Sequence, residues 1–337
     1  MTTSNYNTDD PTFGTVDLDD RYVTDSWLVD QFVGNQLWSW GYNPYGALGL
    51  NNTTSQSSPV QVGTLTNWQQ VAGGGFHTAA VKTDGTLWLW GRNNYGQLGL
   101  SNTTNYSSPV QVGTLTNWRQ VAGGIYHTTA VKTDGTLWSW GNNTYGQLGL
   151  SNTTNYSSPV QVGSLTNWRL VAGGNFNTSA VKTDGTLWSW GFNTYGTLGL
   201  NNTTSQSSPV QVGTLTNWRQ VAGGLHHTAA VKTDGTLWSW GYNNYGQLGL
   251  NDRTNRSSPV QVGSLTNWRQ VAGGSYHTAA VKTDGTLWLW GRNGYGQLGL
   301  NNSTTDQSSP VQVGSLTNWK QVACANFNSL AVNYNDI

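Results

Sequence analysis

Histidine recurs at one phase of this sequence, at multiples of 50 residues, and its imidazole is a common ligand for zinc. The four copies are His77, His127, His227 and His277. Asparagine takes the same position at 177 and 328, and side chains on separate repeats need not converge within the roughly 2 Å that a zinc ligand requires. We therefore expect these histidines to be structural, each hydrogen-bonded to the backbone of a neighbouring repeat, and we expect no metal and no cofactor.

A lysine and an aspartate separated by one residue also recur, in five copies of Lys-Thr-Asp-Gly-Thr, of which Lys82 and Asp84 form the first pair. An Asp-Gly turn between two apolar stretches is typical of a β-hairpin, and its carboxylate accepts hydrogen bonds from local N–H groups. Catalysis depends on a unique constellation, whereas five identical turns indicate a scaffold. We predict a solvated turn, no catalytic residue and a protein that is not an enzyme.

The elements that carry these residues form one repeated unit. A tryptophan marks each copy, at positions 40, 90, 140, 190, 240 and 290, and such fixed spacing is typical of stacked or radial repeats. In one copy we expect four short strands, at 218–224, 227–232, 236–241 and 259–263. Four antiparallel strands with glycine-rich turns form a propeller blade. Each type of strand occurs six times, so we predict an all-β fold, a single β-propeller of six four-stranded blades.

The order of the strands predicts how the ring closes. The chain enters the repeats at a third strand and leaves after a second strand. The last blade is therefore expected to be composite, with two strands from the C-terminal end and two from residues 36–63, which removes the open edges. The chain then divides into an N-terminal arm, residues 1–34, and a propeller, residues 35–337. The alternative is a seventh, degenerate blade built from residues 21–33.

The composition indicates an aromatic core. The chain has 43 glycines and no glutamate, which disfavours long helices, and its 19 tryptophans supply large apolar surfaces. The two tryptophans of Leu-Trp-Ser-Trp-Gly are two residues apart, so they share one face of a strand. We expect them to pack over the glycines and alanines of the next blade. The single cysteine, Cys324, excludes a disulfide within the chain.

Charge is distributed unevenly along the chain. Residues 1–34 contain seven aspartates and one arginine, a net charge of −6, and the remainder carries +6. Contact with phosphate needs a positive surface, so we do not expect the arm to bind nucleic acid. The N-terminal sequence lacks a basic region followed by an apolar run, and no apolar stretch approaches 18 residues. We therefore predict neither a secretory signal nor insertion into a membrane.

The copies differ mainly in two turns, one just before the histidine phase and one just after the Trp-Gly pair. Both turns lie at the same end of a four-stranded meander, which predicts one variable, aromatic face suited to stacking on sugars or gripping protein loops. The candidate binding residues are Tyr42, Phe76, Arg92, Tyr126, Asn142, Phe176, Phe192, His226, Tyr242, Tyr276, Arg292 and Phe327. Within residues 237–250 the candidate site narrows to Tyr242, Asn243 and Asn244. Neutral drift in exposed loops is the alternative explanation.

The repeats resemble those of the RCC1 (regulator of chromosome condensation) family of β-propellers in the sequences WGxNxYGQLGL, PVQVG and VAGGxxHTAAVKTDG, over about residues 36–334. Members of this family usually have seven blades. The founding member is a guanine-nucleotide exchange factor for a small GTPase and binds chromatin, using an insertion between strands and a basic tail. Here the repeats keep one length and the arm is acidic, so exchange activity is the least favoured interpretation.

The arm, in VDLDDRYVTDSWLVDQFVGNQLWSWG, resembles leaders of RCC1-like proteins of marine bacteriophages. This resemblance implies a virion protein, a tail or capsid appendage, whose residues 1–34 bind other virion proteins and whose variable face meets a glycan or protein of the host surface. The candidate anchor residues are Asp17, Asp19, Asp20, Arg21, Tyr22 and Trp27. The alternative is a lectin-like binder of surface glycans, and assembly into a homo-oligomer is left open.

Overall fold

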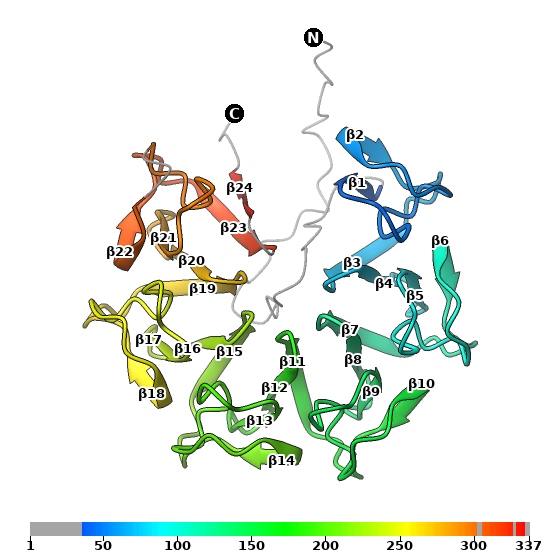
Figure 1. Cartoon of the computed structure of the whole chain (residues 1–337), viewed down its shortest axis with the longest axis horizontal. Helices are drawn as coiled ribbons and strands as arrows, with labels where there is room; N and C mark the ends of the chain where they lie inside the picture. The colour runs from blue at the N-terminus through cyan, green and yellow to red at the C-terminus, as the bar shows by residue number, and fades with distance from the viewer. Residues whose placement is uncertain (1–35, 302–304, 326–327, 334–337) are drawn as a thin grey trace, which may run out of the picture.

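The computed structural model describes residues 36–301, 305–325 and 328–333, and these residues form 24 β-strands and no helix. Figure 1 shows the strands grouped into sheets that are arranged radially around a central axis. The predicted all-β propeller is therefore confirmed. Within these ranges there is accordingly no long apolar helix that could cross a membrane.

Five blades are complete four-stranded sheets, each a meander in chain order. The first contains β3 (Trp68–Gly73), β4 (His77–Lys82), β5 (Leu87–Gly91) and β6 (Tyr106–Gln111). The second contains β7 (Trp118–Gly123), β8 (His127–Lys132), β9 (Leu137–Gly141) and β10 (Tyr156–Gln161). The third contains β11 (Trp168–Gly173), β12 (Asn177–Lys182), β13 (Leu187–Gly191) and β14 (Gln206–Gln211). The fourth contains β15 (Trp218–Gly223), β16 (His227–Lys232), β17 (Leu237–Gly241) and β18 (Arg256–Gln261). The fifth contains β19 (Trp268–Gly273), β20 (His277–Lys282), β21 (Leu287–Gly291) and β22 (Gln307–Gln312).

The strands of the sixth blade come from the two ends of the repeat region. The hairpin of β1 (Trp38–Gly41) and β2 (Gln56–Gln61) supplies the third and fourth strand types, and β23 (Trp319–Cys324) with β24 (Ser329–Asn333) supplies the first and second. The prediction of six blades, the last one composite in sequence, is confirmed in strand number and type. In the described chain the two halves are separate two-stranded sheets (Figure 1). We call the edges of β1 and β24 that pair with no other described strand the seam.

Two predictions about the N-terminal region concern residues that the structure does not describe. The acidic arm with its candidate anchor residues and the alternative seventh blade at 21–33 both lie outside the described ranges.

The blade built from β15–β18 shows how closely the local pattern determines the strands. The first three strands agree with the predicted ranges within a residue at either end. The fourth begins at Arg256, three residues before the predicted start at Pro259. Proline lacks an N–H group, but β18 is the outer strand of its sheet, where one side of the backbone needs no partner. A proline therefore lies within this strand instead of marking its beginning.

Tryptophan side chains join each blade to the one before it. Trp240 is fully buried, and its indole Nε1 donates a 2.9 Å hydrogen bond to the backbone oxygen of Thr197. A Cβ atom added to Gly199 would lie only 2.8 Å from the same Nε1. The predicted packing over the alanines of an adjacent blade is present, since Trp240 shares a core cluster with Ala172, but that blade is the preceding one and not the following one. The hydrogen bond adds a partner that was not predicted, the Thr-Leu-Gly-Leu turn at 197–200, which combines a carbonyl acceptor with a glycine that leaves room for the ring.

The recurrent histidines also join neighbouring blades, through side chains. His127 is fully buried, with its Nε2 3.0 Å from Oγ1 of Thr178 in the next blade, and Thr178 in turn donates to the backbone oxygen of Gln147. The structural role agrees with the prediction, but the partner is a hydroxyl group and not the backbone. Burial lowers the pKa of His127 to about 3, so the ring is neutral at neutral pH.

The Lys-Thr-Asp-Gly-Thr turns are only partly the solvated turns that we predicted. Asp234 is exposed and its Oδ1 accepts hydrogen bonds from the backbone N–H and hydroxyl of Thr236, as expected. Lys232 is buried instead, with its Nζ 3.7 Å from the ring centroid of Trp238. Burial lowers the pKa of Lys232, and the nearby Asp234 carboxylate opposes this change. The lysine is thus part of the aromatic packing between strands.

Candidate functional site

The two variable turns of each blade are held together by a backbone hydrogen bond. The N–H of Tyr242, just after β17, donates to the carbonyl of His226, just before β16, at 2.8 Å. The same bond joins Arg92 to Phe76, Asn142 to Tyr126, Phe192 to Phe176 and Arg292 to Tyr276. Because the bond uses only backbone atoms, the side chains at both positions can change while the turns stay in place. This explains how the predicted variable residues come to lie on one face.

The asparagine that follows the variable position stabilises its own loop and is not part of the binding surface. Asn243 is fully buried; its Oδ1 accepts from the N–H of Leu248, and its Nδ2 donates to the backbone oxygens of Asp252 and Thr254. One side chain thereby fixes both ends of the loop between β17 and β18. Our inclusion of Asn243 in the candidate site was wrong, because a buried amide with three backbone partners has no capacity left for a ligand.

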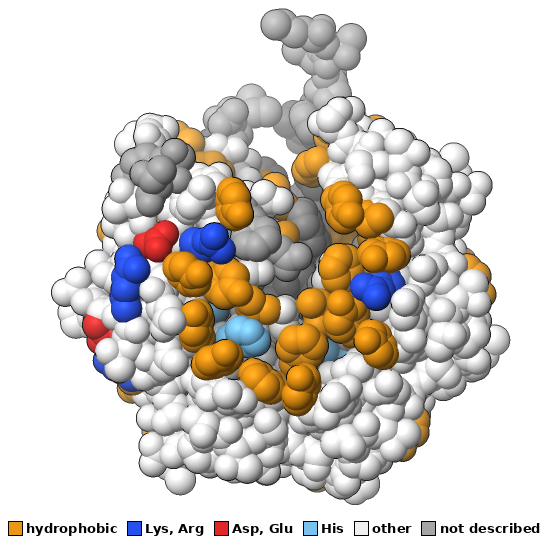
Figure 2. Space-filling view, in the orientation of Figure 1, with side chains coloured by type: hydrophobic (Ala, Val, Ile, Leu, Met, Phe, Trp, Pro, Cys, Tyr) orange, Lys and Arg blue, Asp and Glu red, His pale blue; other side chains and the backbone are white. Residues whose placement is uncertain are grey.

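Aromatic side chains from these turns form a continuous series of ring contacts around the centre of the face. Figure 2 shows this series as hydrophobic side chains that surround a central hollow. Tyr195, for example, lies with its ring centroid 5.0 Å from both His226 and Tyr242. We call the series, with its two arginines, the aromatic belt. Its members are Tyr45, Phe76, Arg92, Tyr95, Tyr126, Tyr145, Phe176, Phe192, Tyr195, His226, Tyr242, Tyr245, Tyr276, Arg292 and Tyr295.

The sequence analysis missed the constant tyrosines of the belt. Tyr245 and its five equivalents were left out of the candidate binding residues because they do not vary. Tyr245 instead lies between its own variable turn and the next one, 6.4 Å from Tyr242 and 5.1 Å from Tyr276 between ring centroids. A signal was present, since a tyrosine three residues after a variable position falls in the same turn. In four blades the belt thus combines a constant tyrosine with two variable side chains, whereas the blade of Tyr126 and Tyr145 supplies one variable side chain and the β1–β2 hairpin supplies only Tyr45.

Two arginines take the place of an aromatic ring in their blades. The Cζ of Arg92 lies 4.8 Å from the ring centroid of Tyr45 and 5.1 Å from that of Tyr126, and Arg292 makes similar contacts with Tyr245 and Tyr276. These are cation–π distances. Burial lowers the pKa of His226 to about 4, so this imidazole adds no charge to the belt at neutral pH.

Three predicted members of the variable face do not join the belt. Asn142 is buried and accepts a hydrogen bond from Nε2 of Gln147, so its amide stabilises its own loop. Tyr42 is 75% exposed at the seam. Phe327 lies outside the described residues.

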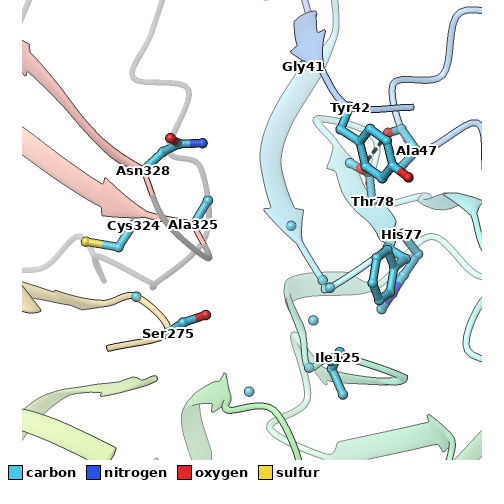
Figure 3. Close-up of a pocket in the computed structure, with 18 of the residues that line it drawn as sticks. Gly41, Tyr42, Ala47, His77, Thr78, Ile125, Ser275, Cys324, Ala325 and Asn328 are labelled. Carbon is cyan, nitrogen blue, oxygen red and sulfur yellow. Dashed lines mark hydrogen bonds between the residues drawn. The ribbon is translucent and has the colours of Figure 1, made fainter. Parts of the chain in front are cut away.

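A cavity of about 720 Å³ lies between the inner turns and the seam. Its walls come mainly from the paired glycines that end each first strand, such as Gly223 and Gly224, and from the β1 half-blade. Figure 3 places Cys324 and His77 on opposite sides of this cavity, with their side chains not directed toward one another. The Nε2 of His77 is already bonded to Thr128. In the described ranges, no three histidine, cysteine or acidic side chains are grouped as a metal site would require.

Comparison with protein families identifies the repeat. The regulator of chromosome condensation (RCC1) repeat matches six consecutive segments, residues 35–81, 84–131, 134–181, 184–231, 234–281 and 284–332. The chain belongs to the RCC1 repeat family. A second description of the RCC1 repeat matches four segments, 68–97, 118–147, 218–247 and 268–297. Comparison with curated protein sequences gives no match.

Solved structures of RCC1-type propellers share the fold of this RCC1-repeat chain. Prp20p from Saccharomyces cerevisiae, described with its binding to Gsp1p and histones, has a TM-score of 0.79 and 24% identity over 90% of this chain and 80% of its own. Human WBSCR16 has a TM-score of 0.69 and 21% identity over 90% and 99% of the two chains. Yeast RCC1 (Prp20) bound to Kap60 has a TM-score of 0.67 and 19% identity over 99% and 97%. These likenesses establish the propeller fold, on which many functions can be built.

Proposed function

We propose that this RCC1-repeat protein is a non-enzymatic interaction module and that the aromatic belt is the surface that holds its partner. The observation that carries the proposal is the unbroken run of ring and arginine contacts from Tyr45 to Tyr295. Clustered tyrosine, phenylalanine and arginine are typical of the residues that dominate binding energy at protein interfaces. The backbone bonds between the turns let the variable positions change their side chains, and so their partner, without a cost to the scaffold.

The orientation of the rings favours a protein partner over a sugar. Most neighbouring rings meet at steep angles, as Tyr145 and Phe192 do at 66°, so they cover one another's faces. Among the described rings of the belt, Phe76 and Tyr126 alone are stacked, at 21°. A collar of ring edges and two arginines suits a protein loop, whereas a sugar ring binds best against an open aromatic face. A lectin-like function is the second candidate, favoured by the exposed rings of Tyr42 and Tyr295 at the seam.

A finer assignment is a virion component of a bacteriophage that is held to the particle by residues 1–34. Its support is the resemblance of that segment to phage leaders. Deletion of residues 1–34 should prevent incorporation into particles and leave the unfolding temperature of the propeller unchanged. Incorporation of the truncated chain would contradict this assignment. Exchange activity is not proposed, because the described repeats differ in length by a single residue, between β21 and β22, and carry no inserted wedge.

The binding role of the belt can be tested with two probe libraries. A displayed random-peptide library and a glycan array are each screened against the full chain, the belt variants Phe192→Ser and Tyr242→Ser, and the control Tyr156→Ser. Tyr156 begins β10, on the outer edge of its blade. Selected peptides should bind the control as tightly as the full chain and each belt variant about tenfold more weakly, a change of about 1.4 kcal/mol. Peptide affinities unaffected by both belt variants would refute the proposal, and belt-dependent binding of glycans alone would favour the lectin.

A further inference from the structure

Cationic side chains recur at one position of the repeats, directly after the tryptophan that begins each first strand. Figure 1 shows these first strands, from β3 to β23, around the centre of the propeller. The position is glutamine in β3, at Gln69, and is arginine or lysine in the other five strands. We call the five cations the basic ring, and its members are Arg119, Arg169, Arg219, Arg269 and Lys320.

Each arginine of the basic ring is held against the following blade by backbone acceptors. The Nη2 atom of Arg219 donates to the backbone oxygens of Trp268 and Arg269, at 3.1 and 2.7 Å, and the two arginines before it make the equivalent bonds. Arg269 in turn donates to the first two backbone oxygens of β23. Successive cations are therefore close to one another. Burial and the charge of Arg219 both lower the pKa of Arg269.

The basic ring holds most of the positive charge that the propeller leaves unbalanced. The lysine of each Lys-Thr-Asp-Gly-Thr turn lies near its own aspartate, as Lys232 lies near Asp234. Arg253 and Arg256 form salt bridges with aspartates. The other cations that follow residue 35 in the sequence are the five of the ring and the two arginines of the belt. Such a concentration of one charge attracts an acidic segment.

The basic ring lies at the end of the propeller opposite the aromatic belt. The N–H of Trp218, just before the ring position of β15, donates to the carbonyl of Gly185 in an Asp-Gly turn, whereas the belt residue His226 follows the other end of β15. The described chain begins at the turn end as well, because Gln36 occupies the repeat position that directly follows such a turn. The N-terminal arm is therefore attached at the face that carries the ring.

We propose that the basic ring is the docking surface for the acidic arm, residues 1–34, of the same chain. The arm has seven aspartates and one arginine, a net charge of −6, and the ring has five positive charges. A tether within one chain gives even a weak contact a high effective concentration. The length of the arm is not a limit, since its 34 residues can span up to roughly 110 Å.

Docking controls access to the arm. A protein that binds residues 1–34 has to displace them from the basic ring. This consequence rests on the proposed role of the arm in the particle, whereas the docking itself rests on the charges and on the positions of the described residues. Contacts between exposed charges add little to stability, so removal of the arm should still leave the unfolding temperature of the propeller unchanged.

Carbodiimide coupling tests the docking in the full chain without a partner. The reagent joins a lysine amine directly to a neighbouring carboxylate, and Lys320 is the one lysine outside the Lys-Thr-Asp-Gly-Thr turns. Asp284 is the internal reference, because its neighbour Gly285 accepts a hydrogen bond from the N–H of Trp319. Coupled peptides are identified by mass spectrometry in a mixture of unlabelled and isotope-labelled chains, which separates links within one chain from links between chains.

Two double variants with the same loss of charge are compared. Arg219→Gln with Arg269→Gln removes two charges from the basic ring, and glutamine already occupies this position at Gln69. The matched control, Arg92→Gln with Arg292→Gln, removes two charges from the belt on the opposite face. Docking predicts links from Lys320 to aspartates of the arm within single chains, several-fold fewer in the ring variant and as many in the control as in the unmodified chain.

A salt series on the unmodified chain keeps the docking testable even if the ring variant does not fold. An increase in salt from about 0.1 M to about 1 M shortens the screening length from about 10 Å to about 3 Å, so the yield of links to the arm should fall several-fold. Circular dichroism shows whether each variant is folded before coupling.

Three results would overturn the proposal. Coupling of Lys320 to Asp284 without links to the arm, or links to the arm only between separate chains, would exclude docking within the chain. A yield that does not change with salt would exclude an electrostatic contact. Equal losses in the ring variant and the belt control would exclude the basic ring as the docking surface. No partner protein is used, so failure of the belt as a binding surface is read separately.

Discussion

The indole N–H of Trp240 and the backbone oxygen of Thr197 form a hydrogen bond across two blades, 43 residues apart in sequence and 2.9 Å apart in space. Four further tryptophans repeat this bond with the same separation along the chain. Each bond lies beside a glycine that has no room for a Cβ atom. The stability of the ring therefore depends on contacts between successive repeats more than on any single blade.

Replacing Trp240 with alanine should lower the free energy of unfolding by about 3–5 kcal/mol, because a fully buried indole is lost and a cavity is left. Urea denaturation followed by circular dichroism measures the change. Trp238 is the matched control, since it is only partly buried and donates to Thr236 in its own sheet. The Trp238→Ala variant should lose clearly less free energy of unfolding. Equal losses would show that the inter-blade contact contributes no more to stability than a contact within one sheet.

Stability should fall as the pH decreases from about 6.5 toward 4. Burial lowers the pKa of His77 and His277 to about 4 and that of His127 and His227 to about 3, whereas the unfolded chain keeps the ordinary value near 6.5. Between these pH values the histidines of the unfolded chain take up protons while the buried histidines of the folded chain stay neutral. The free energy of unfolding therefore reaches its full value only above about pH 6.5. Each site contributes a slope of up to about 1.4 kcal/mol per pH unit.

The His127→Asn variant provides the check on that slope, because asparagine already fills the equivalent position at Asn177. Urea midpoints measured between pH 4 and 7 should show a dependence about one fifth weaker in the variant, because burial also lowers the pKa of His226 and five histidines therefore contribute. A dependence as steep as that of the unmodified chain would mean that the buried histidines do not cause it.

More of the fold than of the candidate site could be predicted from the sequence. The spacing of 50 residues and the Asp-Gly turns predict blade number and three strands of each blade, because these depend on local hydrogen bonding. Contacts between blades could not be predicted in this way. Nothing in the sequence marks the carbonyl of Thr197 as the acceptor for the indole N–H of Trp240. The constant Tyr245 was missed because identical copies hide whether a residue serves packing or a surface. The order of the strands predicts one composite blade, and among the described residues its halves are the separate sheets β1–β2 and β23–β24.

Replacing Lys232 with methionine should lower stability by about 0.5–2 kcal/mol, since the chain length is kept but the cation over the Trp238 ring is lost. A double-mutant cycle with Trp238→Leu isolates this contact, and the loss from Lys232→Met should largely disappear when the ring is absent. The same loss in both backgrounds would assign the effect to the other partners of Lys232, the ring of Trp218 at 4.8 Å and the nearby Asp234. The cycle is measured by urea denaturation at neutral pH.

Asn243 and Asn244 are adjacent in sequence, but we expect alanine to lower stability strongly at Asn243 and very little at Asn244. Asn243→Ala removes the acceptor for the N–H of Leu248 and the donor to Asp252 and Thr254, all at a buried site, so it should cost about 2–4 kcal/mol. The exposed Asn244 should tolerate alanine within about 0.5 kcal/mol. Loosening of the loop should also raise the rate at which Tyr242 is nitrated in the Asn243 variant, because this loop holds the ring in the belt. If Asn243→Ala leaves both stability and nitration unchanged, then the loop is fixed by its glycine turns alone and the buried amide is dispensable.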